Sequence, residues 1–375
     1  LERLKEKNRA GEKLEEASNS RKDNSFLPLN CYNKIMPKLN VLVAGSTGYI
    51  GVQLVKLLIK HRHIKIKYLC GNTSVGKDIY QYDNVLKNKK LPKIVRFNKK
   101  FLEKVSIVFT ALPNGEAQDI AKNLLDNNVL IDLAADFRLE KTSDYLKWYK
   151  QKHRAPSLIK NSIYALPEIT GNIIKNYKII GCPGCYPTSA LLPLIPLIKK
   201  KLIKNYNIII DSKSGYSGAG RGIHSKYKNK NLYESLSAYG VGFHRHNSEI
   251  EQMIKKYSKQ KLTFTFTPHL SPMFRGILST VYVDINKDIT INNLHNELVK
   301  FYKKSPFVNI QKINTLISTN DVINTNNCKI SVCKSKYKNK AIILSSIDNL
   351  IKGGAGQAIQ NMNILYNFNA KEGLK

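Results

Sequence analysis

The stretch KLNVLVAGSTGYIGVQLVKLLIKH constrains the fold of this chain more than any other segment. An apolar, β-branched run from Val41 to Ala44 enters a glycine turn, and apolar residues then recur from Ile50 to Leu58 at the spacing of a helix. The glycines Gly45, Gly48 and Gly51 follow the pattern G-x-x-G-x-x-G, a variant of the dinucleotide-binding fingerprint. The order of strand, turn and helix predicts the opening of a dinucleotide-binding fold.

Each glycine of this turn has a physical role in that fold. Gly45 permits the tight turn, Gly48 lets the backbone approach a pyrophosphate, and Gly51 lets the helix pack closely on the strand. Free amides at the helix start then meet the phosphates. A purely structural turn is the alternative. The expected coenzyme contacts in this segment are Gly45, Ser46, Thr47, Gly48, Tyr49, Ile50 and Gly51.

The residues after the second predicted strand, Ile64 to Cys70, indicate which coenzyme is bound. Sites specific for NAD place an acidic residue near this point to hold the ribose hydroxyls, whereas this chain continues with GNTSVGK. Hydroxyl groups and a lysine suit a 2′-phosphate. We therefore expect NADP, with Thr73, Ser74 and Lys77 as contacts.

Further strands alternate with helical patterns, which predicts an α/β fold on a mostly parallel sheet. Asn114 and Arg138 follow two of these strands, at the edge where such sheets bind ligands, and Asn114 is expected to contact the coenzyme. The guanidinium of Arg138 is suited to a carboxylate or a phosphate. An ion pair with Asp136 or Glu140 is the alternative.

The segment GCPGCYPTSA contains the candidate nucleophile. Pro187 suits the first turn of a helix, which places Cys185 at or just before the helix amino terminus. The partial positive charge there favours a thiolate, so we expect a lowered pKa for Cys185. A zinc site with Cys328 and Cys333, or a redox pair with Cys182, is the alternative. A single nucleophile beside a reduced nicotinamide explains both halves of the sequence, and no metal is expected.

A base for this cysteine is expected in AYGVGFHRHNSEIEQMIKKY. His244 and His246 flank an arginine, and Asn247 or Ser248 is expected to cap a helix that carries Glu249 in its first turn. A histidine is the usual proton carrier and a nearby carboxylate orients it. The pattern does not choose between the two histidines, so one is expected to act and the other to bind substrate.

The segment DSKSGYSGAGRG is predicted to be a glycine- and serine-rich loop that binds an anion, most simply a phosphate. A flexible connector is the alternative. Beyond it, TPHLSPMFRGIL places Arg275 at the entrance of a strand.

Composition limits the class of protein. A chain of 375 residues with 42% hydrophobic content predicts two domains, and no segment suits a membrane span or a secretory signal. The formal net charge of +34 suggests nucleic-acid binding, but the lysines are spread along the whole chain among asparagines and isoleucines, which codon bias explains. We expect a small-molecule substrate, no nucleic-acid or membrane partner and a cytoplasmic protein with reduced cysteines, with a plastid as the alternative location. Residues 1–36 are interpreted as a flexible extension.

Eight segments together resemble the N-acetyl-gamma-glutamyl-phosphate reductase family in its longer form, from about Lys38 to the carboxyl end. They are GSTGYIG, AADFR, YALPEI, PGCYPTSA, SGYSGAGR, HRHNSEIEQ, FTPHLSPMFRGI and DNLIKGGAGQAIQNMN. The resemblance implies that Cys185 is the nucleophile and Cys182 a bystander. It also implies that Asn349 and the glycines of KGGAGQ, with Gly353, close over the nicotinamide.

The resemblance further implies an activity. The enzyme would use NADPH to reduce N-acetyl-L-glutamyl 5-phosphate to N-acetyl-L-glutamate 5-semialdehyde through a Cys185 thioester, in arginine biosynthesis. Ser214, Gly215, Asn349 and Gly353 become further coenzyme contacts, and Arg138, Ser217, Gly218, Arg221 and Arg245 become substrate contacts. A reductase of aminoadipyl or aspartyl phosphate is one alternative. A basic polyanion-binding protein without activity is another.

The expected architecture is a Rossmann-type NADP-binding domain at residues 37–184 and 349–375. An inserted α+β domain with a mixed sheet, residues 185–348, is expected to carry the catalytic groups and to form a homodimer or homotetramer.

Overall fold

The first sheet begins with the strand, turn and helix expected from the sequence. The computed structural model describes residues 38–222, 232–258 and 263–374. Strand β1 (Leu39–Ala44) leads through the glycine turn into α2 (Tyr49–Leu58), and β2 (Ile64–Cys70) lies parallel beside β1. The last four residues of β1 are all buried, as a continuous apolar run requires in a sheet covered on both faces. The predicted extension, residues 1–36, lies outside the described residues.

This sheet has seven strands in the order β3-β2-β1-β4-β5-β7-β6, and every pairing in it is parallel. The order reverses between β1 and β4, the place where open α/β sheets bind ligands. The other strands are β3 (Ile94–Val95), β4 (Ile107–Thr110), β5 (Val129–Asp132), β6 (Ser162–Tyr164) and β7 (Ile179–Gly181).

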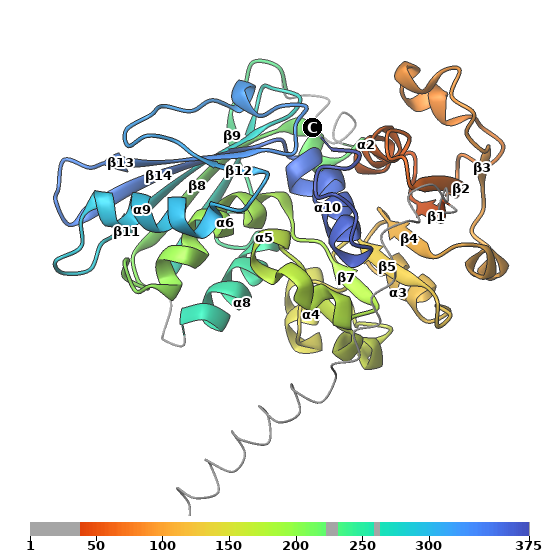
Figure 1. Ribbon diagram of the computed structural model, residues 1–375, viewed down its shortest axis with the longest axis horizontal. Helices are drawn as coiled ribbons and strands as arrows, with labels where there is room; N and C mark the ends of the chain where they lie inside the picture. The colour runs from red at the N-terminus through yellow and green to blue at the C-terminus, as the bar shows by residue number, and fades with distance from the viewer. Residues whose placement is uncertain (1–37, 223–231, 259–262, 375) are drawn as a thin grey trace, which may run out of the picture. The chain divides into compact units, whose positions relative to one another are not determined.

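Short helices connect these strands, and the carboxyl-terminal helices return to them. The connecting helices are η1 (Ile79–Tyr82), η2 (Asn84–Leu86), η3 (Lys99–Lys104), α3 (Glu116–Ala121), α4 (Thr142–Tyr149), η4 (Pro156–Asn161), α5 (Pro167–Thr170) and η5 (Gly171–Asn176). A π-helix, η8 (Ile351–Ala355), continues into α10 (Gly356–Leu365), which packs against α2 and η5 (Figure 1). The end of the chain therefore packs against elements of the first half of the fold.

The second sheet is mixed, with the order β12-β13-β14-β11-β8-β10-β9. The pairs β8–β10 and β12–β13 are parallel and the other pairs are antiparallel. Its strands are β8 (Ile208–Gly215), β9 (Ser237–Ala238), β10 (Phe264–Ser271), β11 (Ile277–Asp284), β12 (Val308–Ile310), β13 (Cys328–Lys334) and β14 (Lys340–Ile347). The expected combination of a parallel Rossmann-type sheet with a second, mixed sheet is confirmed.

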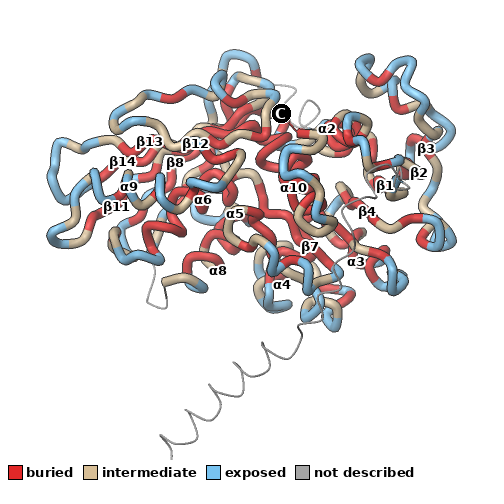
Figure 2. The backbone as a smooth tube through the Cα atoms, viewed as in Figure 1, coloured by how far each residue is buried: buried red, intermediate tan, exposed pale blue. Residues whose placement is uncertain are grey.

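Helix α6 (Cys185–Lys199) is the centre of the second half. It packs against the second sheet, α8 (His246–Ser258) and α9 (Ile291–Tyr302), and nearly all of it is buried (Figure 2). Its sequence is apolar on every side, which suits a helix surrounded by protein. This packing holds the first residue of α6, Cys185, in a fixed position against the first half. None of the helices in the described part of the chain is long and apolar enough to cross a membrane.

Two predictions about local structure were wrong. The first half of DSKSGYSGAGRG is not a loop but the end of β8, because its alternating side chains pair with β10 and β11; η6 (Tyr216–Ala219) follows it. The helix after HRH is not capped at Asn247 or Ser248 but already begins at His246.

The short helix η7 (Thr319–Asp321) precedes β13.

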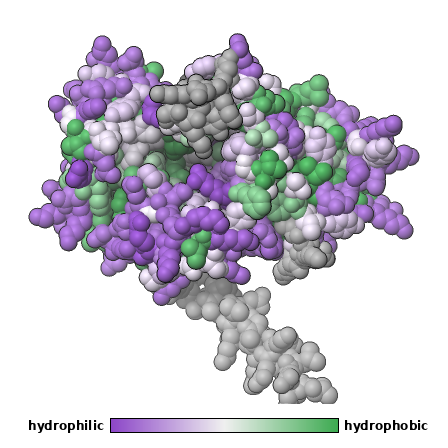
Figure 3. All heavy atoms as spheres, turned by 180° about the vertical axis from the view of Figure 1, so that it is seen from behind, coloured by the Kyte–Doolittle hydropathy of each residue, from purple (hydrophilic) through white to green (hydrophobic). Residues whose placement is uncertain are grey.

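Hydrophilic side chains cover much of the back of the molecule, with apolar side chains in scattered groups (Figure 3). Some large apolar side chains of the second half remain exposed, among them Ile209, Tyr282 and Tyr337.

Candidate active site

A cleft of about 680 Å³ contains residues from both halves of the fold. It lies at the carboxyl ends of β1, β2, β4 and β5, beside the first residue of α6. The predicted site residues that line it are Gly45, Thr47, Gly48, Tyr49, Ile50, Thr73, Ser74, Arg138, Cys185, Ser217, Gly218, Arg221, Arg245, His246, Asn349 and Gly353. The predicted site residues that do not line it are Ser46, Gly51, Lys77, Asn114, Ser214, Gly215, His244 and Glu249.

The glycine turn has the geometry of a phosphate cradle. Gly45 has a φ of +78°, and a Cβ there would lie 2.2 Å from the carbonyl oxygen of Ala111. A Cβ on Gly51 would lie 2.1 Å from the carbonyl oxygen of Gly45, so α2 packs on β1 only because that side chain is absent. Gly48 faces the open cleft. This backbone fits a dinucleotide pyrophosphate.

Ser46 has a structural role in the same turn. Its buried hydroxyl donates a hydrogen bond to the carbonyl oxygen of Cys70, at 3.2 Å, and so ties the turn to β2. The prediction that Ser46 contacts coenzyme therefore finds no support in its position.

The loop after β2 brings hydroxyl groups to the cleft. Thr73 and Ser74 line it, and the Tyr82 hydroxyl donates a hydrogen bond to Oγ of Ser74 at 2.7 Å. Lys77 lies outside the lining. The pattern of the sequence did not identify Tyr82, which enters the site through the later helix η1.

Cys185 is the first residue of α6, with Gly184 as the N-cap, as predicted. The prediction of a lowered pKa was wrong for the free protein, since burial raises the pKa of the Cys185 thiol to about 11. The guanidinium of Arg138 and the N–H of Tyr186 oppose this effect but do not overcome it. The thiol of the free protein is therefore protonated at neutral pH. A Cβ on Gly353 would lie 2.6 Å from Cβ of Cys185, so the π-helix η8 packs directly on the sulfur-bearing residue.

Cys182 lies outside the cleft. Its thiol is buried, accepts a hydrogen bond from Nδ2 of Asn361 at 3.7 Å, and burial raises its pKa to about 12. These surroundings suit a bystander. Among the described residues, no group of three or more His, Cys, Asp or Glu side chains is placed to hold a metal ion, so the zinc alternative finds no support.

The two histidines have different positions. His246 lines the cleft, and its Nε2 lies 2.4 Å from where a Cβ on Gly184 would be, so the ring reaches the residue before Cys185. Burial lowers the pKa of His246 well below its ordinary value, which keeps the ring neutral. Its Nδ1 is buried without a hydrogen-bond partner among the described residues.

His244 lies outside the cleft lining, so its position gives no support to a role in substrate binding. Its Nδ1 accepts a hydrogen bond from the N–H of His246 at 3.1 Å, and its ring packs edge-on against Tyr186, Tyr239 and Phe266. Burial lowers the pKa of His244 to about 4. His244 thus supports the backbone that carries His246.

Glu249 lies behind the cleft, fully buried, and bonds three groups. Its Oε1 accepts a hydrogen bond from Arg138 at 3.0 Å; its Oε2 accepts hydrogen bonds from the hydroxyl of Tyr164 at 3.0 Å and from the N–H of Gly184 at 2.8 Å. The distance from Oε1 to Nε2 of His246 is 3.7 Å, too long for a hydrogen bond. The expected role of orienting the histidine is therefore replaced by anchoring Arg138 and the turn before Cys185. Tyr164 belongs to YALPEI, a segment to which the sequence reasoning gave no role.

The two alternative partners considered for Arg138, Asp136 and Glu140, are engaged elsewhere, and Glu140 pairs with Lys256 at 3.0 Å. Asp136 accepts hydrogen bonds from the N–H groups of Gly115 and Ala117 and from the hydroxyl of Tyr145. Arg138 is therefore free of Asp136 and keeps its Nε buried without a hydrogen-bond partner among the described residues. That donor is available to a bound anion.

Asn349 joins the cleft to the second sheet. Its Oδ1 accepts a hydrogen bond from the N–H of Gly276 at 2.7 Å, and its Nδ2 donates one to Oγ of Ser217 at 3.0 Å. Ser214 instead donates a hydrogen bond to the carbonyl oxygen of Gly215 and lies outside the lining.

Arg221 lies at the end of the cleft formed by the glycine turn. Its Nε donates a hydrogen bond to the carbonyl oxygen of Thr47 at 2.8 Å, and its guanidinium carbon lies 4.4 Å from the centre of the Tyr49 ring. These partners belong to the glycine turn and the start of α2. Its position therefore argues against the predicted role in substrate binding.

Comparisons with known families agree with this arrangement. Residues 40–177 match the family model described as semialdehyde dehydrogenase, NAD binding domain, and residues 185–349 match the model described as semialdehyde dehydrogenase, dimerisation domain. Together the two models cover most of the chain.

Curated relatives give a finer assignment. A Clostridium botulinum protein named N-acetyl-gamma-glutamyl-phosphate reductase is 42% identical over 339 residues, which are 90% of this chain and 98% of the relative. An Arabidopsis thaliana protein named probable N-acetyl-gamma-glutamyl-phosphate reductase, chloroplastic, is 40% identical over 348 residues, 91% of this chain and 86% of the relative.

Solved structures share the fold at lower identity. The aspartate semialdehyde dehydrogenase from Candida albicans, determined with NADP, has a TM-score of 0.65 and 16% identity, over 88% of this chain and 98% of that one. Aspartate semialdehyde dehydrogenase II from Vibrio cholerae has a TM-score of 0.64 and 18% identity, over 88% of this chain and 98% of that one. The fold, the cleft and the curated relatives together show that this chain belongs to the N-acetyl-gamma-glutamyl-phosphate reductase family of semialdehyde dehydrogenases.

Proposed function

We propose that this protein reduces N-acetyl-L-glutamyl 5-phosphate to N-acetyl-L-glutamate 5-semialdehyde with NADPH and releases phosphate, a step of arginine biosynthesis. The main support for the proposal is that Cys185, the first residue of α6, lines the same cleft as the glycine turn. The names of the curated relatives specify the substrate and the direction of the reaction. The NADP in the Candida albicans structure supports the choice of coenzyme.

Cys185 acts as the nucleophile. Its raised pKa leaves little thiolate at neutral pH, so His246, neutral because of its lowered pKa, takes the thiol proton. The sulfur attacks the acyl carbon; the C–S bond forms, the bond to the phosphate oxygen breaks, and the departing phosphate takes up a proton from solvent. A thioester on Cys185 remains.

The thioester is then reduced and released. NADPH, when bound, supplies the hydride that adds to the thioester carbon. The first turn of α6 directs backbone N–H groups at the resulting oxyanion. Glu249 already binds the N–H of Gly184, so the donors are the N–H groups that follow it. When the C–S bond breaks, the aldehyde leaves and His246 returns its proton to the sulfur.

Two arginines are placed for the anionic groups of the substrate. Arg138 and Arg245 line the cleft near Cys185, and Arg138 has a buried, unpartnered Nε. Glu249 neutralises part of the charge of Arg138 and holds its guanidinium in one orientation. A carboxylate or phosphate can then bind to the side of the guanidinium that Glu249 leaves open. Ser217 and Gly218, which also line the cleft, are proposed as further substrate contacts.

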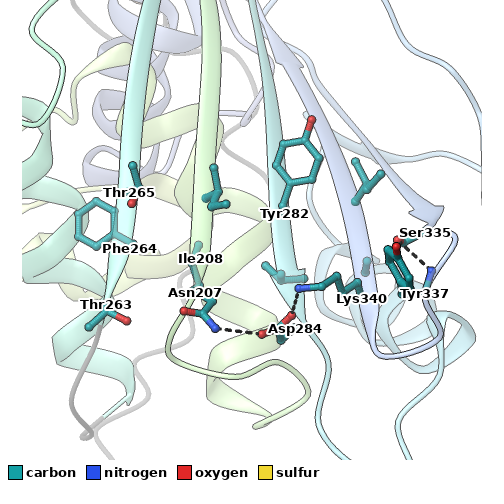
Figure 4. A pocket seen from close by; sticks show the side chains of 14 residues that line it. Asn207, Ile208, Thr263, Phe264, Thr265, Tyr282, Asp284, Ser335, Tyr337 and Lys340 are labelled. Atoms are coloured by element: carbon teal, nitrogen blue, oxygen red, sulfur yellow. Dashed lines mark hydrogen bonds and ion pairs between the residues drawn. The ribbon is translucent and has the colours of Figure 1, made fainter.

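We also propose that the chain assembles as a homodimer or homotetramer through the face of the second sheet that α6 and α9 leave uncovered. A hollow of about 620 Å³ on that face is lined by residues of β8, β10, β11 and β14 (Figure 4). Ile209 is 46% exposed and Tyr282 is 40% exposed there, so a partner would remove apolar area from water. Sedimentation of Ile209→Lys tests this, since a smaller species than wild type is expected.

The division of the chain and its location are part of the same proposal. Residues 37–184 and 349–375 would form the NADP-binding domain and residues 185–348 the catalytic domain, which agrees with the two separate sheets. The cytoplasm is the proposed location, with a plastid as the alternative suggested by the chloroplastic relatives. Fractionation of the source cells decides between them.

The function is tested in the reverse direction. Phosphate-dependent reduction of NADP with N-acetylglutamate semialdehyde is expected for wild type and for Cys182→Ser, and not for Cys185→Ser. Loss of activity in both variants, or in neither, would overturn the assignment of the nucleophile. A panel with aspartate semialdehyde and an aminoadipate-derived semialdehyde tests the two alternative substrates.

A further inference from the structure

Three arginines line the cleft, and they divide into two groups. Arg138 is bonded to Glu249, and Arg245 lies 5.9 Å from the centre of the Tyr149 ring, so both belong to the Cys185 end. Arg221 belongs to the other end of the cleft. The two ends thus have separate cationic groups.

Arg221 crosses from the second half of the fold to the first. It follows η6, but its Nε donates a hydrogen bond to the carbonyl oxygen of Thr47 at 2.8 Å and its Nη2 donates one to the carbonyl oxygen of Tyr82 at 3.3 Å. Its guanidinium also lies over the ring of Tyr49. These contacts hold the planar group in one orientation, which reduces the entropy lost when it binds an anion.

The surroundings of Arg221 are suited to a phosphate. Both of these hydrogen bonds go to main-chain carbonyls, so they leave its charge available to a ligand. Tyr82 also bonds Ser74 in the loop after β2, which places Arg221 beside the hydroxyls of that loop. The carboxylate of Asp83 is nearby, but it is paired with Lys56 at 2.8 Å.

The loop after β2 has no cation of its own in the cleft. Its lining residues are Gly71, Asn72, Thr73 and Ser74, and its lysine, Lys77, is not among them. The end of the second strand is where a dinucleotide-binding fold meets the 2′ position of the adenosine ribose, and an arginine near this point accommodates a 2′-phosphate. Arg221 is the cleft-lining cation at that place within the described residues.

We propose that Arg221 binds the 2′-phosphate of NADPH together with Thr73 and Ser74, and so determines the preference for NADPH over NADH. The inference rests on the proposed function, which supplies the coenzyme. It replaces the role in substrate binding expected from the sequence. Because Arg221 belongs to the segment after β8, the second half of the fold takes part in choosing the coenzyme bound by the first half.

Direct binding tests the proposal without turnover. Calorimetry or nicotinamide fluorescence gives dissociation constants for NADPH, NADH and adenosine 2′,5′-bisphosphate with wild type, Arg221→Gln and Arg221→Lys. We expect Arg221→Gln to weaken NADPH and the bisphosphate by about 10- to 100-fold and to leave NADH within about twofold, since one charged hydrogen-bonding group is lost. Arg221→Lys should recover part of the affinity.

Arg96→Gln is the matched control, because it removes one exposed positive charge from the first half of the fold and Arg96 does not line the cleft. It should leave all three affinities unchanged. Equal weakening of NADPH and NADH by Arg221→Gln would assign Arg221 to the pyrophosphate and overturn the proposal. A loss of bisphosphate affinity in Lys77→Gln, with none in Arg221→Gln, would overturn it as well. If wild type binds neither coenzyme, the proposed function itself fails, which is a separate outcome.

Discussion

The ammonium of Lys352 lies 2.5 Å from Oε1 of Glu168, and both side chains are buried. The pair joins the π-helix η8, which packs on Cys185, to α5 of the first half of the fold. Gln360 bonds both partners, accepting from Lys352 at 2.9 Å and donating to Glu168 at 2.8 Å. This buried network fixes the part of the cleft wall that packs on Cys185.

Lys352→Met should destabilise the protein strongly, because it leaves the Glu168 carboxylate buried without its counter-charge. We expect the free energy of unfolding to fall by about 3–5 kcal/mol. Urea denaturation followed by circular dichroism measures it. The double variant Lys352→Met with Glu168→Gln should regain much of the loss; a double variant no more stable than the single one would show that the charge is not the cause.

Gly353→Ala should reduce turnover more than substrate affinity. The new Cβ would lie 2.6 Å from Cβ of Cys185, so the nucleophile must shift from its position in the cleft. A displacement of this size costs about 100-fold in kcat. Gly354→Ala provides the comparison, because its Cβ would be close, at 2.8 Å, only to the end of the flexible Ile50 side chain, and the Asn349 carbonyl oxygen would lie at an ordinary contact distance of 3.6 Å. Steady-state kinetics should show the smaller loss for Gly354→Ala, and equal losses would contradict this account.

Alkylation of Cys185 in the free protein should accelerate with pH. Its pKa of about 11 lies above the working range, so the reactive thiolate fraction grows about tenfold for each pH unit from about pH 7 to about pH 10. Arg138→Gln should slow the reaction at every pH, since the guanidinium of Arg138 lowers the thiol pKa. Mass spectrometry after timed iodoacetamide treatment measures modification at Cys185. A rate that levels off near neutral pH would mean that the thiolate is already formed.

The variants His246→Asn and His244→Asn should differ in their effects on kcat and on the pH profile. His246 reaches the residue before Cys185, so its loss should lower kcat by about 100- to 10,000-fold. It should also remove the acidic limb of the pH profile, where protonation of His246 abolishes the base. His244 acts only through its hydrogen bond to the N–H of His246. Its replacement should lower kcat less and keep the shape of the pH profile. A larger loss for His244→Asn would reverse the two roles.

Several features of this protein were readable in short segments of the chain. The glycine turn, the first strand and helix, and the placement of Cys185 at the start of α6 were all predicted, because glycine conformation, apolar spacing and a proline in the first turn act over a few neighbouring residues. The family was recognisable for the same reason, since its motifs are local.

Other features depended on residues that meet only after folding. Glu249 bonds Arg138 across 111 residues of sequence, and Arg221 bonds Thr47 across 174, so neither partner was apparent from the chain. The raised pKa of Cys185 arises from burial. This effect exceeds the lowering of the pKa that was expected from the helix amino terminus alone. Spacing along the chain dictates local conformation, whereas partner choice and desolvation depend on which distant surfaces pack together. Here that packing placed His246, and not His244, in the lining of the cleft, and placed Arg221 against the glycine turn.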